Sequence, residues 1–387
     1  MAVNRDADLV ILGAGCAGLS LAARLAVQAP GLRVELIEPR TEYVDDRSWC
    51  FWRPMRHDLS DIVSKTWSSW RFSTVDGREA RHSVPGLAYQ YIRGADFYAR
   101  SRAAIDSASR VTLSLGVSAG ELNRVAGGIR VDTDQGSLVA AHVIDTRPQR
   151  TEALLFQCFT GVEIQTVEPH GLDLDEVGLM TRMESDSAGL GFVYALPLSR
   201  DRALIEWTRF SAVPLSKAEL AAGLDNALAR LGLEGARILR TEGGILPMGR
   251  SPRTEDPLPG VFLAGNTGGG LRAASGFGFL RIGRWADACA AALASGRAPF
   301  GHPPEPWARR EMDRIFLQAV REHPERTADY FSALASGVPA AGLVRFLSDS
   351  ARPGDYARII ASLPLLPFLA QIPPRPELFR TPELVTR

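Results

Sequence analysis

Residues 8–18 read DLVILGAGCAG, an apolar run that leads directly into a Gly-x-Gly-x-x-Gly turn. The run predicts a buried strand, and the alanine and leucine content of residues 19–27 predicts a helix after the turn. In this context Gly13 allows the tight turn, Gly15 lets the backbone approach a pyrophosphate, and Gly18 lets helix and strand pack closely. The helix amino terminus adds amide donors for that anion. The segment therefore predicts a dinucleotide-binding βαβ unit.

An acidic residue ends the next apolar run. Residues 34–37 predict a second strand, and Glu38 follows it. A carboxylate at this position accepts hydrogen bonds from ribose hydroxyls and disfavours a 2′-phosphate. We therefore expect Glu38 to bind FAD or NAD rather than NADP.

A second glycine-rich segment favours FAD over NAD. Residues 261–266 read VFLAGN and resemble the strand and turn that many flavoproteins place against the ribityl chain, although those proteins commonly have Asp where this chain has Asn. The candidate cofactor-binding residues here are Gly265, Asn266, Gly268, Gly269 and Gly276. The alternative is a flexible loop before the helix predicted over residues 279–294.

Composition narrows the function classes. The chain has 387 residues with 44 basic and 44 acidic side chains, so its formal net charge is zero. It therefore has no net positive charge that would attract nucleic acid. The cysteines lack metal-binding spacing, which predicts no metal site and a reducing, cytoplasmic location; they are Cys16, Cys50, Cys158 and Cys289. Prolines interrupt the longest uncharged stretch, residues 359–374, so we expect no transmembrane helix.

Changes of pattern along the chain predict a division into domains. Residues 1–150 and 243–300 form a discontinuous nucleotide-binding domain, residues 151–242 a substrate domain of mixed β-sheet, and residues 301–387 a helical region. Turn residues and short apolar runs predict a meander of strands at 111–115, 128–132 and 137–140, followed by a separate strand at 143–145. Long strands are predicted at 191–197 and 203–210, before a helix at 216–231. The aromatic segment at 47–72 is predicted to line a cavity or to pack between domains.

Several motifs resemble those of the flavoprotein lycopene cyclases, over nearly the whole chain. They are DDRSWCF at 45–51, DTRP at 145–148, QCFTG at 157–161, FVYALPLS at 192–199, LIEWT at 204–208, GILPM at 244–248, RAASGFG at 272–278 and RFLSD at 345–349. The chain differs where the family usually has Met-Asp, because here Met180 precedes Thr181. We interpret Thr181 as a position that influences substrate choice.

The resemblance implies an α/β fold whose Rossmann-like FAD-binding domain is of the glutathione-reductase and aromatic-hydroxylase type. It implies redox-neutral cyclisation of the ends of a linear carotenoid, lycopene to γ- or β-carotene, with reduced FAD as the active form and NADPH or NADH as electron donor. Arg47, in the first motif, joins the candidate cofactor-binding residues, and Glu206 matches the family's essential glutamate.

Alternation along residues 203–210 places Glu206 on one face with Leu204, Thr208 and Phe210. A carboxyl on such an apolar face keeps its proton near neutrality, which suits a catalytic acid. The alternative is a structural salt bridge to Arg209 or Arg182. Nearby aromatic residues, Trp49 and Trp52 among them, either stabilise a cation or simply pack.

Other functions stay open. The chain could cyclise another linear isoprenoid, act as a flavin monooxygenase, or bind flavin without catalysis. The monooxygenase pattern has Asp-Gly where this chain has Asp145 and Thr146. A long polyene must come from lipid, so we expect peripheral contact with the inner face of the membrane. The apolar segment 363–372 either contacts that lipid or packs in the core, and the core role is the expected one. The oligomeric state is open.

Overall fold

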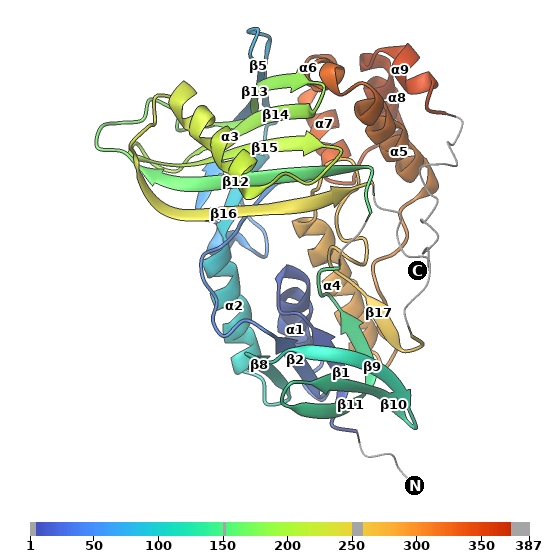
Figure 1. Ribbon diagram of the computed structural model, residues 1–387. Helices are drawn as coiled ribbons and strands as arrows, with labels where there is room; N and C mark the ends of the chain where they lie inside the picture. Colours follow the sequence, from blue (N-terminus) through green and yellow to red (C-terminus); the bar gives the residue numbers. More distant parts are fainter. Residues whose placement is uncertain (1–4, 150–151, 250–257, 373–387) are drawn as a thin grey trace, which may run out of the picture.

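The computed structural model describes residues 5–149, 152–249 and 258–372. A sheet with a parallel centre and its helices form one end of the molecule (Figure 1). A mixed sheet with longer strands, called the larger sheet below, forms the other end (Figure 1). The predicted domain boundary at 150 and 151, and the end of the helical region at 373–387, lie outside the described residues.

The first sheet is the predicted nucleotide-binding unit. Its strands run in the order β8-β2-β1-β11-β10-β9, and β17 also pairs with β11. Their bounds are β1 Ala7–Leu12, β2 Val34–Glu38, β8 Val111–Leu115, β9 Ala119–Val125, β10 Gly128–Thr133, β11 Gly136–Asp145 and β17 Val261–Leu263. Helix α1 (Cys16–Gln28) packs against α2 (Gly94–Asp106) and α4 (Phe279–Ala294). This arrangement confirms the Rossmann-like α/β fold.

The predicted meander was wrong in two details. Residues 111–115 pair in parallel with β2 instead of joining the meander, whose first strand is β9. The strands predicted at 137–140 and 143–145 are one strand, β11, which pairs antiparallel with β10 and parallel with β1. The strand β9 was missed because none of its residues is fully buried and its sequence, AGELNRV, shows little apolar alternation.

The second sheet is mixed, as predicted. Its order is β16-β12-β15-β14-β13-β5-β6, antiparallel except where β13 pairs with β5. The bounds are β5 Ser69–Thr74, β6 Glu79–Ser83, β12 Leu155–Gln165, β13 Glu176–Asp186, β14 Gly189–Pro197, β15 Arg202–Ser211 and β16 Arg237–Met248. Residues 69–83 and 243–248, which the proposed division gave to the nucleotide-binding part, therefore pair within this sheet. Helix α3 (Lys217–Arg230) contacts β12 and β15, and Ser216 caps it.

The aromatic segment joins the two ends of the molecule. It forms β3 (Ser48–Arg53) and β4 (Lys65–Trp67), which pair with β7 (Ala88–Arg93), together with the short 3-10 helix Ser60–Ile62. Within β3, Phe51 packs in the core of the nucleotide-binding end and Trp52 in the core of the larger sheet. The segment thus packs between the two ends, as predicted.

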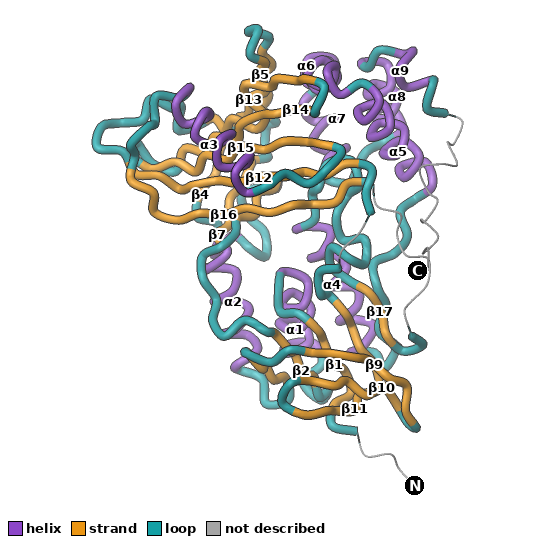
Figure 2. Tube along the Cα trace, in the orientation of Figure 1, coloured by secondary structure: helices purple, strands orange, loops and turns teal. Residues whose placement is uncertain are grey.

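Helices close one side of the larger sheet (Figure 2). They are α5 Trp307–Glu322, α6 Thr327–Gly337, α7 Ala340–Leu347, α8 Pro353–Ser362 and α9 Leu365–Leu369, with the 3-10 turn Pro324–Arg326 before α6. Helix α6 contacts β5, β6 and β13, and the apolar core of this end lies between sheet and helices. Among the described residues, no helix has the length and apolar character needed to span a membrane.

Candidate active site

The β1–α1 turn has the geometry predicted from its glycines. Gly13 has a φ of +91°, where a side chain would be strained, and a Cβ on Gly18 would lie 2.0 Å from the carbonyl oxygen of Gly13. A Cβ on Gly15 would have no atom within 4 Å. Gly13 and Gly18 are therefore required by the turn itself, whereas Gly15 borders open space at the amino terminus of α1.

Glu38 lies beside this turn and is buried. Its carboxylate accepts a hydrogen bond of 2.6 Å from the backbone N–H of Ala14 and one of 2.8 Å from Arg40 Nε. The Arg40 guanidinium and the Tyr43 hydroxyl also donate to the carbonyl oxygen of Ala14, at 3.0 and 2.9 Å. Sequence reasoning missed Arg40 and Tyr43, although an arginine two residues after the strand-terminal acid was a usable signal.

The predicted second glycine segment lies against the first. A Cβ on Gly265, whose φ is +63°, would be 3.2 Å from Ala17 Cβ in α1. Gly268 lies in a tight turn, since a Cβ there would be 2.3 Å from the Leu263 carbonyl oxygen, while Gly269 borders open space with a φ of +91°. Asn266 is exposed in the same turn. The structure thus brings residues 265–269 next to the start of α1.

The same loop continues from the nucleotide-binding end to the larger sheet. A Cβ on Gly276 would lie 2.7 Å from the side-chain oxygen of Gln157 in β12. This Gln157 oxygen is buried and has no hydrogen-bond partner among the described residues. A buried acceptor without a partner is costly, so its position favours a donor supplied by a bound molecule.

Arg47 lies at the edge of this region. Its guanidinium is exposed and pairs with Asp46 at 3.3 Å. Burial raises the pKa of the Cys16 thiol to about 12, and the charges of Arg24 and Arg47 oppose that rise, so Arg47 lies near the first residue of α1. The side chain is accessible to an anion bound at that helix end.

Glu206 lies at the other end of the molecule, in β15. The predicted alternation is confirmed, because Leu204 and Phe210 belong to the core between the sheet and the C-terminal helices, whereas Ile205 belongs to the core beneath α3. Burial raises the pKa of Glu206 well above its ordinary value of 4.5; the neighbouring Glu242 carboxyl raises it further and Arg240 opposes the rise. The direction of this shift favours the protonated carboxyl, as the apolar face predicts.

The two arginines considered as salt-bridge partners of Glu206 bind other groups. Arg209 pairs with Asp186, and Arg182 Nη2 donates to the carbonyl oxygen of Arg230 at 2.9 Å. Both arginines therefore have partners other than Glu206.

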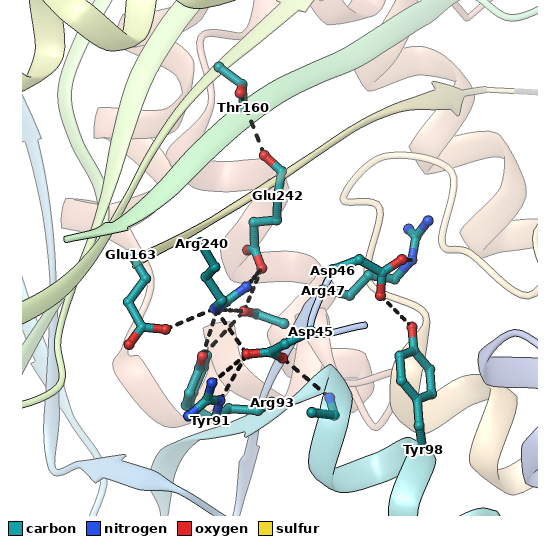
Figure 3. A network of polar contacts seen from close by, with 12 residues as sticks. Asp45, Asp46, Arg47, Tyr91, Arg93, Tyr98, Thr160, Glu163, Arg240 and Glu242 are labelled. Carbon is teal, nitrogen blue, oxygen red and sulfur yellow. Dashed lines mark hydrogen bonds and ion pairs between the residues drawn. The ribbon is translucent and has the colours of Figure 1, made fainter. Parts of the chain in front are cut away.

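Arg240 of β16 is the centre of a polar network (Figure 3). Two of its members, Arg240 and Glu242, act on the pKa of Glu206. The Arg240 guanidinium donates to Glu163 at 2.8 Å, to Glu242 at 2.5 Å and to the Tyr91 hydroxyl at 2.7 Å. Asp45, from the first family-like motif, pairs with Arg240 at 3.3 Å. The network thus ties the segment after β2 to the larger sheet.

An apolar cavity of about 260 Å³ lies between the larger sheet and the C-terminal helices. Tyr194, which lines it, is directly opposite Glu206 on the neighbouring strand β14. Gln157, Ser275 and Phe277 also line the cavity, so the glycine loop borders it as well. The cavity therefore connects the region of Glu206 with the end of the nucleotide-binding loop.

The two tryptophans considered for cation stabilisation lie in different places. Trp49 stacks on Phe279 with ring centroids 5.3 Å apart, within the nucleotide-binding end. Trp52 packs 5.5 Å from Phe277, which lines the cavity. Trp52 is thus the one adjacent to the cavity wall.

Thr181 is absent from the described residues that line the cavity. Its hydroxyl donates to the carbonyl oxygen of Val193 at 2.9 Å. A Cβ on Gly178 would contact both Thr181 and Ala195, and Ala195 belongs to the core beneath α3. Thr181 therefore faces away from the cavity.

The fold gives the class of the protein: an α/β fold with a Rossmann-like FAD-binding domain. Similar solved structures include a geranylgeranyl bacteriochlorophyll reductase-like protein from Thermoplasma acidophilum, with a TM-score of 0.60, 14% identity, and coverage of 92% of this chain and 96% of that one. A mutant of the halogenase PltM in complex with FAD has a TM-score of 0.55 at 13% identity, with coverage of 92% and 86%.

The family follows from sequence comparison. The family model described as "Lycopene cyclase protein" matches residues 8–372, and the chain belongs to this family. A lycopene beta-cyclase of Pseudescherichia vulneris is 27% identical, over 93% of this chain and 95% of the relative. A lycopene beta-cyclase of Paracoccus sp. is 32% identical, over 62% of this chain and 61% of the relative.

Proposed function

We propose that this chain closes rings at the ends of a linear carotenoid, converting lycopene to γ- or β-carotene without net oxidation or reduction. The observation that carries the proposal is the Glu206 carboxyl, whose pKa burial raises well above its ordinary value and which stands beside the wall of an apolar cavity. An acid that keeps its proton in an apolar environment suits protonation of an alkene. The relatives named lycopene beta-cyclase support the substrate class.

The residues at the nucleotide-binding end fit FAD. The open space beside Gly15 and the amino terminus of α1 would take the pyrophosphate, and Glu38 would take the ribose. The unpartnered oxygen of Gln157 supports a polar group of the cofactor near Gly276. Reduced FAD, when bound, supplies negative charge that stabilises a cation nearby. NADPH or NADH is the proposed donor that reduces it.

Glu206 performs the proton transfer in this proposal. It donates its proton to a terminal double bond, the electron pair of a neighbouring double bond closes the six-membered ring, and loss of a ring proton leaves a new double bond. One proton is added and one is lost, so the sum of the steps is an isomerisation. Of the two tryptophans considered for cation stabilisation, Trp52 is the one that packs against a cavity-lining residue, Phe277, so it is the candidate that the proposal keeps.

Pigment analysis in a host that accumulates lycopene tests this function. The wild-type chain should yield cyclic carotenoids, and Glu206→Gln should lower their formation by at least about 10²-fold, the usual contribution of a general acid, while retaining FAD. Glu176→Gln is the matched control, because Glu176 is a buried glutamate of the same sheet that pairs with Arg71 at 2.9 Å. Unchanged lycopene with the wild type would contradict the substrate, and an active Glu206→Gln would contradict the acid.

Peripheral contact with a membrane is part of the proposal. Helix α9 and its neighbours carry exposed apolar side chains, including Leu365, Leu366 and Ile372, and residues 363–365 line the cavity. A water-insoluble polyene has to pass from lipid into the cavity, and this apolar surface lies next to the cavity wall. We therefore assign the lipid-facing side of the protein to α8 and α9.

A further inference from the structure

Two glutamates of the larger sheet face each other across a glycine. Glu206 of β15 and Glu242 of β16 both stand opposite Gly161 of β12, which lies between those strands. A Cβ on Gly161 would be 2.5 Å from Glu206 Cγ. The missing side chain therefore gives the Glu206 carboxyl room to lie across β12 on the side of Glu242, whose carboxyl raises the pKa of Glu206.

Glu242 is held firmly in this position. It is 8% exposed, accepts a hydrogen bond of 2.7 Å from the Ser48 hydroxyl, and forms an ion pair of 2.5 Å with Arg240. Arg240 is itself anchored by Glu163, which is 1% exposed. Glu242 already has two partners, Ser48 and Arg240, and the pKa of Glu206 is raised, which favours the protonated form of Glu206.

We propose that Glu242 is a positioning residue which orients the Glu206 carboxyl and keeps it protonated between turnovers. The inference rests on the proposed function and deepens it. When Glu206 has given its proton to the alkene, two carboxylates face each other in a buried site, and their repulsion makes Glu206 a stronger base. The proton lost from the ring can then return to Glu206, which restores the starting state with no other reactant.

The other titratable groups around Glu206 carry no charge near neutrality. Burial raises the pKa of Cys50 in β3, of Tyr89 in β7 and of Tyr194 in β14, with Glu206 itself adding to each rise. In the described part of the chain, the groups that interact electrostatically with Glu206 are these three together with Arg240 and Glu242 of β16. Glu242 is therefore the anion that opposes ionisation of Glu206.

The pH dependence of turnover tests whether Glu242 keeps Glu206 protonated. Glu206 acts in its protonated form, so activity is lost as the pH rises through its pKa. Removing the charge of Glu242 lowers that pKa, so in Glu242→Gln we expect the alkaline limb of kcat to move down by at least about one pH unit. FAD content should not change. Glu242→Asp should restore part of the shift, and the control Glu176→Gln should keep the wild-type limb.

A second variant addresses the geometry. Gly161→Ala places a methyl group against Glu206 Cγ, so we expect kcat to fall by about tenfold or more with FAD retained. The assay uses the flavin-reduced enzyme with lycopene in phosphatidylcholine vesicles. If kcat of Glu242→Gln falls at the same alkaline pH as kcat of the wild type, the positioning role of Glu242 is wrong, while the acid role of Glu206 stays intact. An active Glu206→Gln would instead overturn the proposed function.

Discussion

Gly15 allows a direct test of the cofactor site at the level of one residue. A Cβ there meets no atom within 4 Å, so a side chain costs the fold little and occupies the space assigned to the pyrophosphate. We expect Gly15→Val to fold but to lose the flavin absorbance of the purified protein. Gly31→Val is the control, since Gly31 also borders open space and lies outside the turn.

Equal FAD binding by the two variants would contradict this placement of the pyrophosphate. If Gly15→Val binds as much FAD as Gly31→Val, the pyrophosphate lies elsewhere. A loss of FAD in both variants would point to a general effect of valine at open glycine positions.

Single residues differed in how far sequence patterns could predict them. Alternation along one strand was enough to place Glu206 on the same face as Leu204 and Phe210, which belong to the core between the larger sheet and the C-terminal helices. Glu242 and Arg240 were not predicted, because they meet Glu206 only through the register of two strand pairs that share Gly161. Local patterns along a strand contain no information about register between strands.

At the level of an element, the orientation of β13 changes the interpretation of Thr181. Its hydroxyl donates to the Val193 carbonyl oxygen, and its side chain is buried away from the cavity. An aspartate there would place a carboxylate against that carbonyl oxygen, so we expect Thr181→Asp to reduce stability by about 1 to 3 kcal/mol. Thermal unfolding measures this change.

The control for this prediction is Thr181→Val, which keeps the volume and loses only the hydroxyl. It should be less destabilising than Thr181→Asp. A stable Thr181→Asp with an altered product range would restore the interpretation of Thr181 as a position of substrate choice.

Helix α9 provides the test of lipid contact. Leu366 is 80% exposed and is not among the described cavity-lining residues, so Leu366→Glu should leave the cavity intact. We expect this variant to sediment less with phosphatidylcholine vesicles and to cyclise vesicle-borne lycopene more slowly, because a charge opposes insertion of the apolar surface.

Val167→Glu is the matched control, since Val167 is 99% exposed and lies in the loop after β12. It should sediment as the wild type does. Equal sedimentation of Leu366→Glu and the wild type would exclude α9 from the lipid-facing side.

Elements with strong apolar patterns were predictable, and those that depend on distant pairing were not. The helix at 279–294 and the strand–turn–helix around Gly15 agree with the sequence patterns. The strands β5 and β6 join a sheet whose other members follow more than seventy residues later, at Leu155 and beyond. Their apolar periodicity shows a buried face without identifying the partner strand.

Across the whole molecule, the glycine loop after β17 and the segment after β2 join the nucleotide-binding end to the cavity. A Cβ on Gly265 would meet Ala17 of α1, and a Cβ on Gly276 would meet Gln157 of the larger sheet, so the loop lies close to both. Asp45 pairs with Arg240 of β16. In the proposed function, these two segments would join a cofactor seated on α1 to a substrate in the cavity.

The central claim is that the chemistry is a proton-driven isomerisation. Its most direct measurement is anaerobic turnover of lycopene by the purified, flavin-reduced protein in D₂O with hydride-labelled NADPH. The account predicts cyclic carotenoid that carries deuterium from solvent, no label from the hydride, and no NADPH oxidation in proportion to product. Oxidation of one NADPH for each product formed, or a requirement for oxygen, would contradict it.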